Sequence, residues 1–242
     1  MQRKEFLKRG FSALGAIGIV PLMGACTKNS DITPDTTTTG STNGSSSSNC
    51  VVTNIETEGP FPTKTPSSLV TNDIRSDRTG VAMTVAITIK NKNSNCAALA
   101  GALVDIWHCD AAGNYSEYGG TNMQTTNYTS VHFLRGRQTT DANGAVNFTT
   151  IFPGWYSGRA VHIHVHIYSS TGQSLLVTQI AFPAAVCDTV FTTATNYYKK
   201  GKADTTNEKD NVFGDGYTNE LSSIAGSVDK GYALTHTIVV SA

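Results

Sequence analysis

Short runs of alternating apolar and polar residues, separated by Gly, Asn and Asp, fill the chain beyond residue 50. The segment 81–90, VAMTVAITIK, alternates over much of its length, as a strand with one buried face does. Runs rich in β-branched and aromatic residues predict further strands at 102–107, 145–152, 161–168, 175–182 and 235–240. The pattern therefore predicts an all-β fold, an antiparallel β-sandwich with long loops.

Three clusters of turn-forming residues separate these runs, at 110–114, 141–144 and 169–172. Their glycines and asparagines accept a positive φ, and their Asp and Ser side chains bond to nearby backbone. Between the last strands, 188–200 is expected to form a short helix, although its threonines are poor helix formers. The polar, Gly-containing segment 204–219 is expected to be a long surface loop.

The first 26 residues have the three parts of an export signal. A basic start with Arg3, Lys4, Lys8 and Arg9 precedes an apolar stretch at 11–22 and small residues before Cys26. The apolar stretch is shorter than the ~20 residues that a membrane-spanning helix needs. Residues 1–26 are therefore expected to direct export rather than to span a membrane.

The end of this signal, LMGAC at 22–26, resembles a bacterial lipoprotein box, in which the cysteine becomes the lipidated first residue. The resemblance implies a periplasmic or cell-surface protein attached to a bacterial membrane through Cys26. Residues 3–8, RKEFLK, also resemble a twin-arginine export motif whose second Arg is replaced by Lys. The simpler interpretation, that these are the positive charges of any signal peptide, is favoured.

Residues 27–49 are almost wholly Thr, Ser, Gly, Asn, Asp and Pro, which cannot bury enough apolar surface to fold. A disordered tether is expected there, followed by one domain at 50–242. Lys and Arg number 18, as do Asp and Glu. This balance gives no overall field that would favour nucleic acid as a partner.

Four cysteines remain for the domain if Cys26 carries a lipid: Cys50, Cys96, Cys109 and Cys187. An even number in an exported chain predicts two disulfides, with three pairings open. The alternative is that some are buried free thiols. Because the chain has no CxxC pair, a structural zinc site is a poor explanation.

The segment 159–167, RAVHIHVHI, carries three of the six histidines. On a strand, His162, His164 and His166 share one face with Cα atoms about 6.6 Å apart, while the intervening apolar residues pack on the other. Two neighbouring imidazoles on such a face can converge on one metal ion. Imidazole alone does not select the metal, since it suits zinc, copper, iron and nickel.

Two tyrosines narrow the choice of metal. Tyr156 follows a Pro-Gly turn shortly before His162, and Tyr115 follows the turn at 110–114. Together these residues resemble the intradiol ring-cleavage dioxygenases, whose ferric iron is bound by two tyrosinates and two histidines. The resemblance covers nearly the whole domain as an ordered series of motifs, at 58–62, 134–144, 150–154 and 178–179.

The resemblance implies a β-sandwich of the intradiol dioxygenase type that binds Fe(3+) through Tyr115, Tyr156, His162 and His164. It also places Arg159 beside the substrate and Gln179 next to the iron ligands. Tyr118 is the alternative to Tyr115, and His166 is expected outside the ligand set.

The implied reaction uses O2 to cleave a small aromatic diol of the catechol type between its two hydroxyl-bearing carbons, giving a muconate-type diacid. Tyr156 would leave the iron and take up a substrate proton, while Arg159 would stabilise developing negative charge. A trivalent cation favours phenolate over phenol, which explains the use of tyrosine.

Two features depart from the large catechol and protocatechuate enzymes. The gap from Tyr156 to His162 is shorter, as in the compact exported branch of the family. Ala160 replaces the usual proline between Arg159 and His162. These departures bear on substrate identity more than on iron binding.

Two other functions are compatible with parts of the sequence. A transthyretin-like or collagen-binding-type surface module, without catalysis, would use the turns and core around 101–105 and 140–144. A zinc-dependent hydrolase would use His162, His164 and His166. A zinc site is colourless, whereas tyrosinate bound to ferric iron gives a red-brown charge-transfer band.

Overall fold

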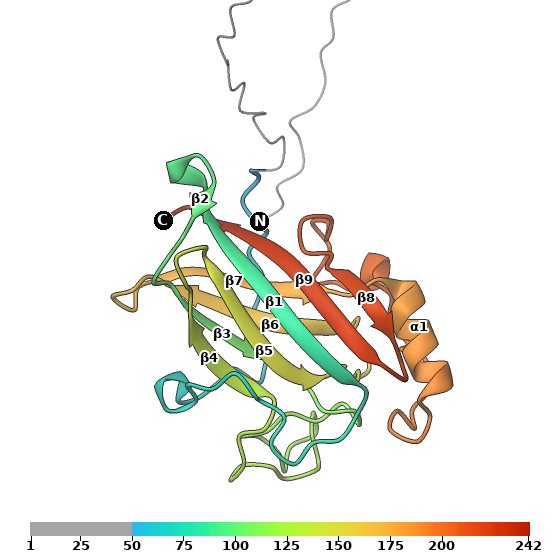
Figure 1. Cartoon of the computed structure of the whole chain (residues 1–242). Helices are drawn as coiled ribbons and strands as arrows, with labels where there is room; N and C mark the ends of the chain where they lie inside the picture. The colour runs from blue at the N-terminus through green and yellow to red at the C-terminus, as the bar shows by residue number, and fades with distance from the viewer. Residues whose placement is uncertain (1–49) are drawn as a thin grey trace, which may run out of the picture. The chain divides into compact units, whose positions relative to one another are not determined.

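The computed structural model describes residues 50–242. The expected export signal at 1–26, with Cys26, and the expected tether at 27–49 lie outside the described residues. The described part consists of two sheets, one in front of the other in Figure 1, with a single α-helix beside them. No helix in this part is long and apolar enough to cross a membrane.

The front sheet has the strand order β2-β1-β9-β8, and β5 pairs with the same edge of β1 as β2, opposite β9. Its strands are β1 (Ala82–Asn91), β2 (Ala97–Ala98), β5 (Ala145–Ile151), β8 (Ser223–Ser227) and β9 (Gly231–Val240). The second sheet has the order β4-β3-β6-β7. Its strands are β3 (Leu103–Trp107), β4 (Arg135–Thr139), β6 (His162–Tyr168) and β7 (Ser174–Ala181).

The alternation of β1 puts its apolar side chains between the sheets. Val85 and Ile87 are fully buried, whereas Thr84 is exposed. From the second sheet, Ile163 and Val165 of β6 enter the same core. The all-β sandwich is thus confirmed, and its driving force is the burial of these inward faces. One pair departs from the antiparallel expectation, because β1 and β9 run parallel.

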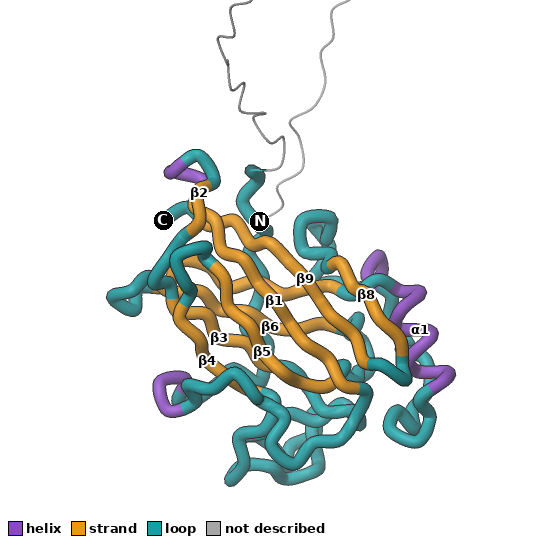
Figure 2. Tube along the Cα trace, in the orientation of Figure 1, coloured by secondary structure: helices purple, strands orange, loops and turns teal. Residues whose placement is uncertain are grey.

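All six predicted strands are present, with ends that differ by a few residues. The three predicted turns also close, through hydrogen bonds from Gly113 N to Asp110 O, Gly144 N to Asp141 O and Gly172 N to Ser169 O. β2, β4 and β8 were not predicted: β2 has only two residues, and neither RGRQT of β4 nor SIAGS of β8 alternates clearly. Figure 2 shows that long loops gather at one end of the strands.

The expected helix at 188–200 exists but lies earlier in the chain, as α1 (Ala184–Thr193). Pro183 occupies the N-cap, where its missing N–H costs no helical bond. Three short 3₁₀ helices complete the secondary structure: η1 (Pro66–Ser68), η2 (Lys92–Ser94) and η3 (Asn207–Lys209).

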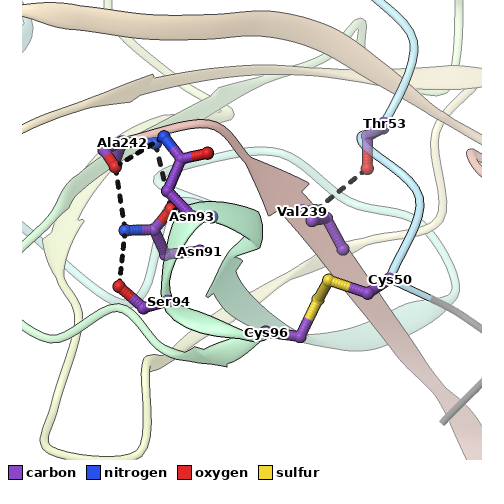
Figure 3. Close-up of a disulfide and its surroundings, with 8 residues drawn as sticks. All are labelled: Cys50, Thr53, Asn91, Asn93, Ser94, Cys96, Val239 and Ala242. Atoms are coloured by element: carbon purple, nitrogen blue, oxygen red, sulfur yellow. Dashed lines mark hydrogen bonds between the residues drawn. A yellow bond between two sulfur atoms is a disulfide. The ribbon is translucent and has the colours of Figure 1, made fainter. Parts of the chain in front are cut away.

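One disulfide joins Cys50 to Cys96, beside the end of the chain (Figure 3). Close to it, Asn91 Nδ2 donates to Ala242 O at 3.0 Å, and Val239 N donates to Thr53 Oγ1 at 3.0 Å. The bond to Thr53 holds the first described residues against the end of β9, and the bond from Asn91 joins the end of β1 to Ala242.

The prediction of a second disulfide is wrong. Cys109 and Cys187 are buried free thiols in different apolar clusters. Burial raises the pKa of both thiols far above its ordinary value, so neither is a reactive thiolate. An even number of cysteines does not show which of them form a disulfide and which remain as buried thiols.

Candidate metal centre

The three histidines of β6 face away from the core, as strand alternation requires, because Ile163, Val165 and Ile167 occupy the inner face. They are nevertheless buried. The outer face of the sheet is covered by the loops at 108–134 and 152–161 and by residues 56–64, hereafter the strap. The histidines therefore lie in a protected layer between the sheet and these segments.

His162 and His164 point their Nε2 atoms at one another, 3.1 Å apart. His162 Nδ1 donates to Ala160 O at 2.6 Å, which places the proton on Nδ1 and leaves the Nε2 lone pair directed into the site. The indole of Trp107 stacks on His164 with ring centroids 4.9 Å apart. Both imidazoles are thus held in one orientation.

Two tyrosine hydroxyl groups complete the cluster. Tyr115 Oη lies 3.3 Å from His162 Nε2, and Tyr156 Oη lies 3.4 Å from the same atom. The backbone of Tyr115 is held by Gln124, whose amide accepts from Tyr115 N at 2.6 Å and donates to Tyr115 O at 2.8 Å. The structure therefore brings together all four side chains that the sequence singled out as metal ligands.

The alternative tyrosine points elsewhere. Tyr118 Oη donates to Pro62 O at 2.7 Å, so its hydroxyl group anchors the strap. His166 is also engaged: its Nε2 lies 2.8 Å from Ser174 Oγ, and its Nδ1 lies 2.8 Å from both Glu58 and Tyr168. Within residues 50–242, no three His, Cys, Asp or Glu side chains are grouped to hold a metal ion. The three histidines named for the zinc-hydrolase alternative are therefore not grouped at one point in this part of the chain.

Burial keeps the four clustered groups uncharged in the absence of a cation. It lowers the pKa of His162 to about 3, with a further contribution from the positive charge of Arg159, and it depresses the pKa of His164 strongly. It raises the pKa of Tyr115 well above its ordinary value and also raises that of Tyr156, against the effect of Arg159. A neutral imidazole has a free lone pair for a cation, and a phenol can lose its proton when a cation binds.

This donor set fits ferric iron. Two phenol oxygens and two imidazole nitrogens converge on one point, and a trivalent ion there would offset the cost of ionising the buried phenols. Imidazole suits iron, and anionic oxygen stabilises its higher charge.

Arg159 and Gln179 lie beside this cluster, as expected. Arg159 Nη1 is 3.4 Å from Tyr156 Oη, and Nη2 donates to Gln179 Oε1 at 2.5 Å. Gln179 Nε2 in turn donates to Thr57 O at 2.9 Å. The three contacts connect Tyr156 to the strap.

The strap contacts residues on both sides of the tyrosine–histidine cluster. Arg135, which is fully buried, donates to Phe61 O at 2.9 Å, and Phe61 stacks on Tyr115 with centroids 5.0 Å apart. Gly59 has a φ of +67°, and a Cβ there would lie 3.1 Å from Cε1 of His164. Only glycine allows the strap to approach the imidazole so closely.

Asp210 is the site residue that sequence analysis missed. The segment 204–219 was expected to be a surface loop, but Asn207, Asp210 and Phe213 within it are buried. The Asp210 carboxylate accepts from Arg159 Nε at 2.9 Å. The adjacent apolar residues Val212 and Phe213, in a mostly polar segment, were the available signal that part of this loop packs inward.

The chain was compared with known families, proteins and structures. The family model described as "Dioxygenase" matches residues 58–199, a range that contains all six predicted site residues. A chlorocatechol 1,2-dioxygenase of Rhodococcus opacus is 26% identical over 142 residues, 51% of this chain and 51% of that protein. The chain thus spans about half the length of this curated relative.

Two solved structures cover most of the domain. An intradiol ring-cleavage dioxygenase from Tetranychus urticae has a TM-score of 0.70 at 26% identity, covering 79% of this chain and 95% of that chain. The dioxygenase domain of a carbohydrate-binding fusion protein from Streptomyces sp. SirexAA-E has a TM-score of 0.57 at 26% identity, covering 79% and 99%. With the clustered tyrosines and histidines, these similarities establish that the chain belongs to the intradiol ring-cleavage dioxygenase family.

Proposed function

We propose that this protein is an Fe(3+)-dependent dioxygenase that cleaves a catechol-type ring between its two hydroxyl-bearing carbons with O2. The product is a muconate-type diacid. One observation carries this proposal: the hydroxyl oxygens of Tyr115 and Tyr156 and Nε2 of His164 all lie within 3.1–3.4 Å of Nε2 of His162. Neither a surface module nor a three-histidine zinc site requires this convergence.

Ferric iron would be held by Tyr115, Tyr156, His162 and His164. When bound, it would supply a positive centre that attracts the diol oxygens and activates the ring towards O2. Two phenolates and two neutral imidazoles would only partly offset the charge of a trivalent ion. The site would keep a small net positive charge, which suits an anionic diol.

Tyr156 is the ligand best placed to leave. Tyr115 is only 1% exposed and is packed under Phe61, whereas Tyr156 is partly exposed. Because burial raises the pKa of the Tyr156 phenol, its oxygen holds a proton at neutral pH once it is away from a cation. Tyr156 can therefore take up a proton from a substrate hydroxyl group.

Arg159 contributes fixed positive charge beside the same oxygen. Its Nη1 lies 3.4 Å from Tyr156 Oη, and its guanidinium group is mostly buried, so its charge is weakly screened. Negative charge that builds up on the substrate would be stabilised there. Gln179, which is fully buried, connects Arg159 to Thr57 of the strap.

Colour and turnover test this function. Purified protein loaded with ferric iron should show a visible charge-transfer band that Tyr156→Phe alters and iron removal abolishes. Oxygen uptake with a panel of catechols, with the diacid product identified by mass spectrometry, should show turnover. A zinc-loaded protein that hydrolyses esters, with a colourless iron-treated form, would contradict the proposal.

The location of the protein is part of the same proposal. The lipoprotein-box resemblance of 22–26 supports export and attachment to a bacterial membrane through a lipid on Cys26. Cells fed a radiolabelled fatty acid should label the wild-type protein and not Cys26→Ser. Label on both proteins, or on neither, would count against attachment at this residue.

A further inference from the structure

Every nitrogen of the Arg159 guanidinium group has a defined partner. Nη1 lies at Tyr156 Oη, Nη2 donates to Gln179 Oε1, and Nε lies 2.9 and 3.0 Å from the two carboxylate oxygens of Asp210. Because the guanidinium group is planar, contacts on three sides leave it one orientation. Each Nη retains one further hydrogen that these bonds do not use.

Asp210 is itself locked in place. Its side chain is fully buried, and its oxygens also accept from Ala160 N at 2.7 Å and Val212 N at 2.9 Å. A buried carboxylate is stable only where such donors and a countercharge replace its lost hydration. Asp210 therefore connects its own loop to the backbone next to Arg159.

The backbone next to Arg159 supplies one of these donors. The residue after Arg159 is Ala160, which has the N–H that a proline at this position would lack. Asp210 lies beyond residues 58–199, the part that matches the family model. The alanine supplies the N–H that the carboxylate accepts.

We propose that Asp210 is a positioning residue that acts through Arg159. It holds the guanidinium group so that Nη1 stays beside the Tyr156 oxygen and the unused Nη hydrogens remain available to the substrate. This inference rests on the proposed function, in which Tyr156 leaves the metal and Arg159 stabilises substrate charge. A carboxylate that only anchored its loop would matter equally with or without Arg159.

The test compares Asp210→Asn with wild type as iron-loaded full-length protein. Iron content per chain should be unchanged, because the four ligand side chains are untouched. The charge-transfer band should shift, since Arg159 Nη1 no longer stays at the Tyr156 oxygen. The kcat per bound iron with the best catechol of the panel should fall about 10- to 100-fold, as for other partners that orient a metal site, with a smaller change in KM.

A double-mutant cycle separates positioning from anchoring. In an Arg159→Ala background, Asp210→Asn should change kcat by less than about threefold, because the group through which it acts is gone. Asp204→Asn is the matched control: this exposed carboxylate is on the same loop and accepts from Gly158 N at 3.2 Å. It should leave both the band and kcat unchanged.

The proposal is overturned if Asp210→Asn leaves the band and kcat unchanged, or if it causes the same loss in both backgrounds. If Asp210→Asn does not fold, Asp210→Glu keeps the charge but displaces the guanidinium group, and it should show the band shift with a smaller loss. If wild type turns over no catechol, the proposed function fails. The band in wild type, Asp210→Asn and the double variant then still decides whether Asp210 positions Arg159.

Discussion

The hydroxyl oxygen of Tyr115 lies 3.3 Å from Nε2 of His162, although 47 positions separate the two residues. Tyr118, in the same loop, directs its hydroxyl group to the backbone of Pro62 instead. Two nearby tyrosines with the same intrinsic chemistry therefore have different roles, which the geometry of one loop decides.

Removing each hydroxyl group in turn should separate these roles. Tyr115→Phe should abolish the charge-transfer band or weaken iron binding at least tenfold, because a ligand oxygen is lost. Tyr118→Phe should keep the iron and the band, and should lose only the bond to the strap, about 1 kcal/mol of stability. Iron titration with visible absorption measures both. If Tyr118→Phe loses the band while Tyr115→Phe keeps it, the ligand assignment is wrong.

Gly59 is expected to control how the strap packs on His164. In Gly59→Ala the added Cβ would lie 3.1 Å from the imidazole, in a backbone with φ of +67° that disfavours alanine. Displacement of the strap or the ring should lower iron affinity about 10-fold, the lower end of the effect of losing a group that orients a ligand. Iron affinity can be measured by competition with a chelator.

Gly120→Ala is the matched control for this change. Its φ of +69° imposes the same backbone strain, but nothing lies within 4 Å of an added Cβ. It should lower stability by about 1 kcal/mol and leave iron affinity unchanged. Equal losses of affinity in the two variants would show that strain, rather than contact with His164, is responsible.

Glu56 and Glu220 lie along the open edge of β7. Glu56 N donates to Val177 O at 2.8 Å, and Ala181 N donates to Glu220 O at 2.9 Å. Within the described residues, Oε1 of Glu56 and Oε2 of Glu220 are buried without a hydrogen-bond partner. Burial, with Asp215, raises the pKa of Glu56 to about 7, and burial, with Glu56, raises that of Glu220 to about 8.

These raised pKa values predict a loss of stability with rising pH. Between the ordinary glutamate pKa of 4.5 and about 8, the folded state holds protons that the unfolded state has released. The contribution of the pair is therefore complete below pH 4.5 and is lost as pH rises through the folded pKa values. Glu220→Gln should gain stability relative to wild type as pH increases from about 5 to 8.5.

Thermal unfolding of both proteins across this range measures the difference. Glu208→Gln serves as the control, because the bond from Tyr217 lowers the pKa of Glu208 from its ordinary 4.5, further below this range. The Glu208→Gln difference should be constant with pH. A constant difference for Glu220→Gln as well would contradict the raised pKa values.

The Cys50–Cys96 disulfide should be a major contribution to stability. It closes a loop with a sequence separation of 46, for which the chain-entropy model gives about 4 kcal/mol. Denaturant unfolding of Cys50→Ser/Cys96→Ser should show a loss of this order. Dithiothreitol should destabilise wild type and leave the double variant unchanged. Equal sensitivity of both to dithiothreitol would mean that the bond does not form in the isolated protein.

Much of the fold could be predicted because alternation reports directly on burial. The run VAMTVAITIK became β1, and the His-x-His-x-His run became β6 with its histidines on one face. Prediction failed where burial came from tertiary contacts between polar residues. Arg135 on β4 is fully buried because it bonds to Phe61 O and Ser116 O, partners that no local pattern identifies.

The sequence by itself determined the sandwich, the shared face of His162 and His164, and the residue types that suit ferric iron. Strand periodicity and donor chemistry are properties of short segments, so they can be read without a structure. Only the tertiary structure decided that Tyr115 rather than Tyr118 joins the histidines, and that Asp210 reaches Arg159 from a polar loop. Contacts of this kind depend on how distant loops pack over the sheet, which local sequence does not specify.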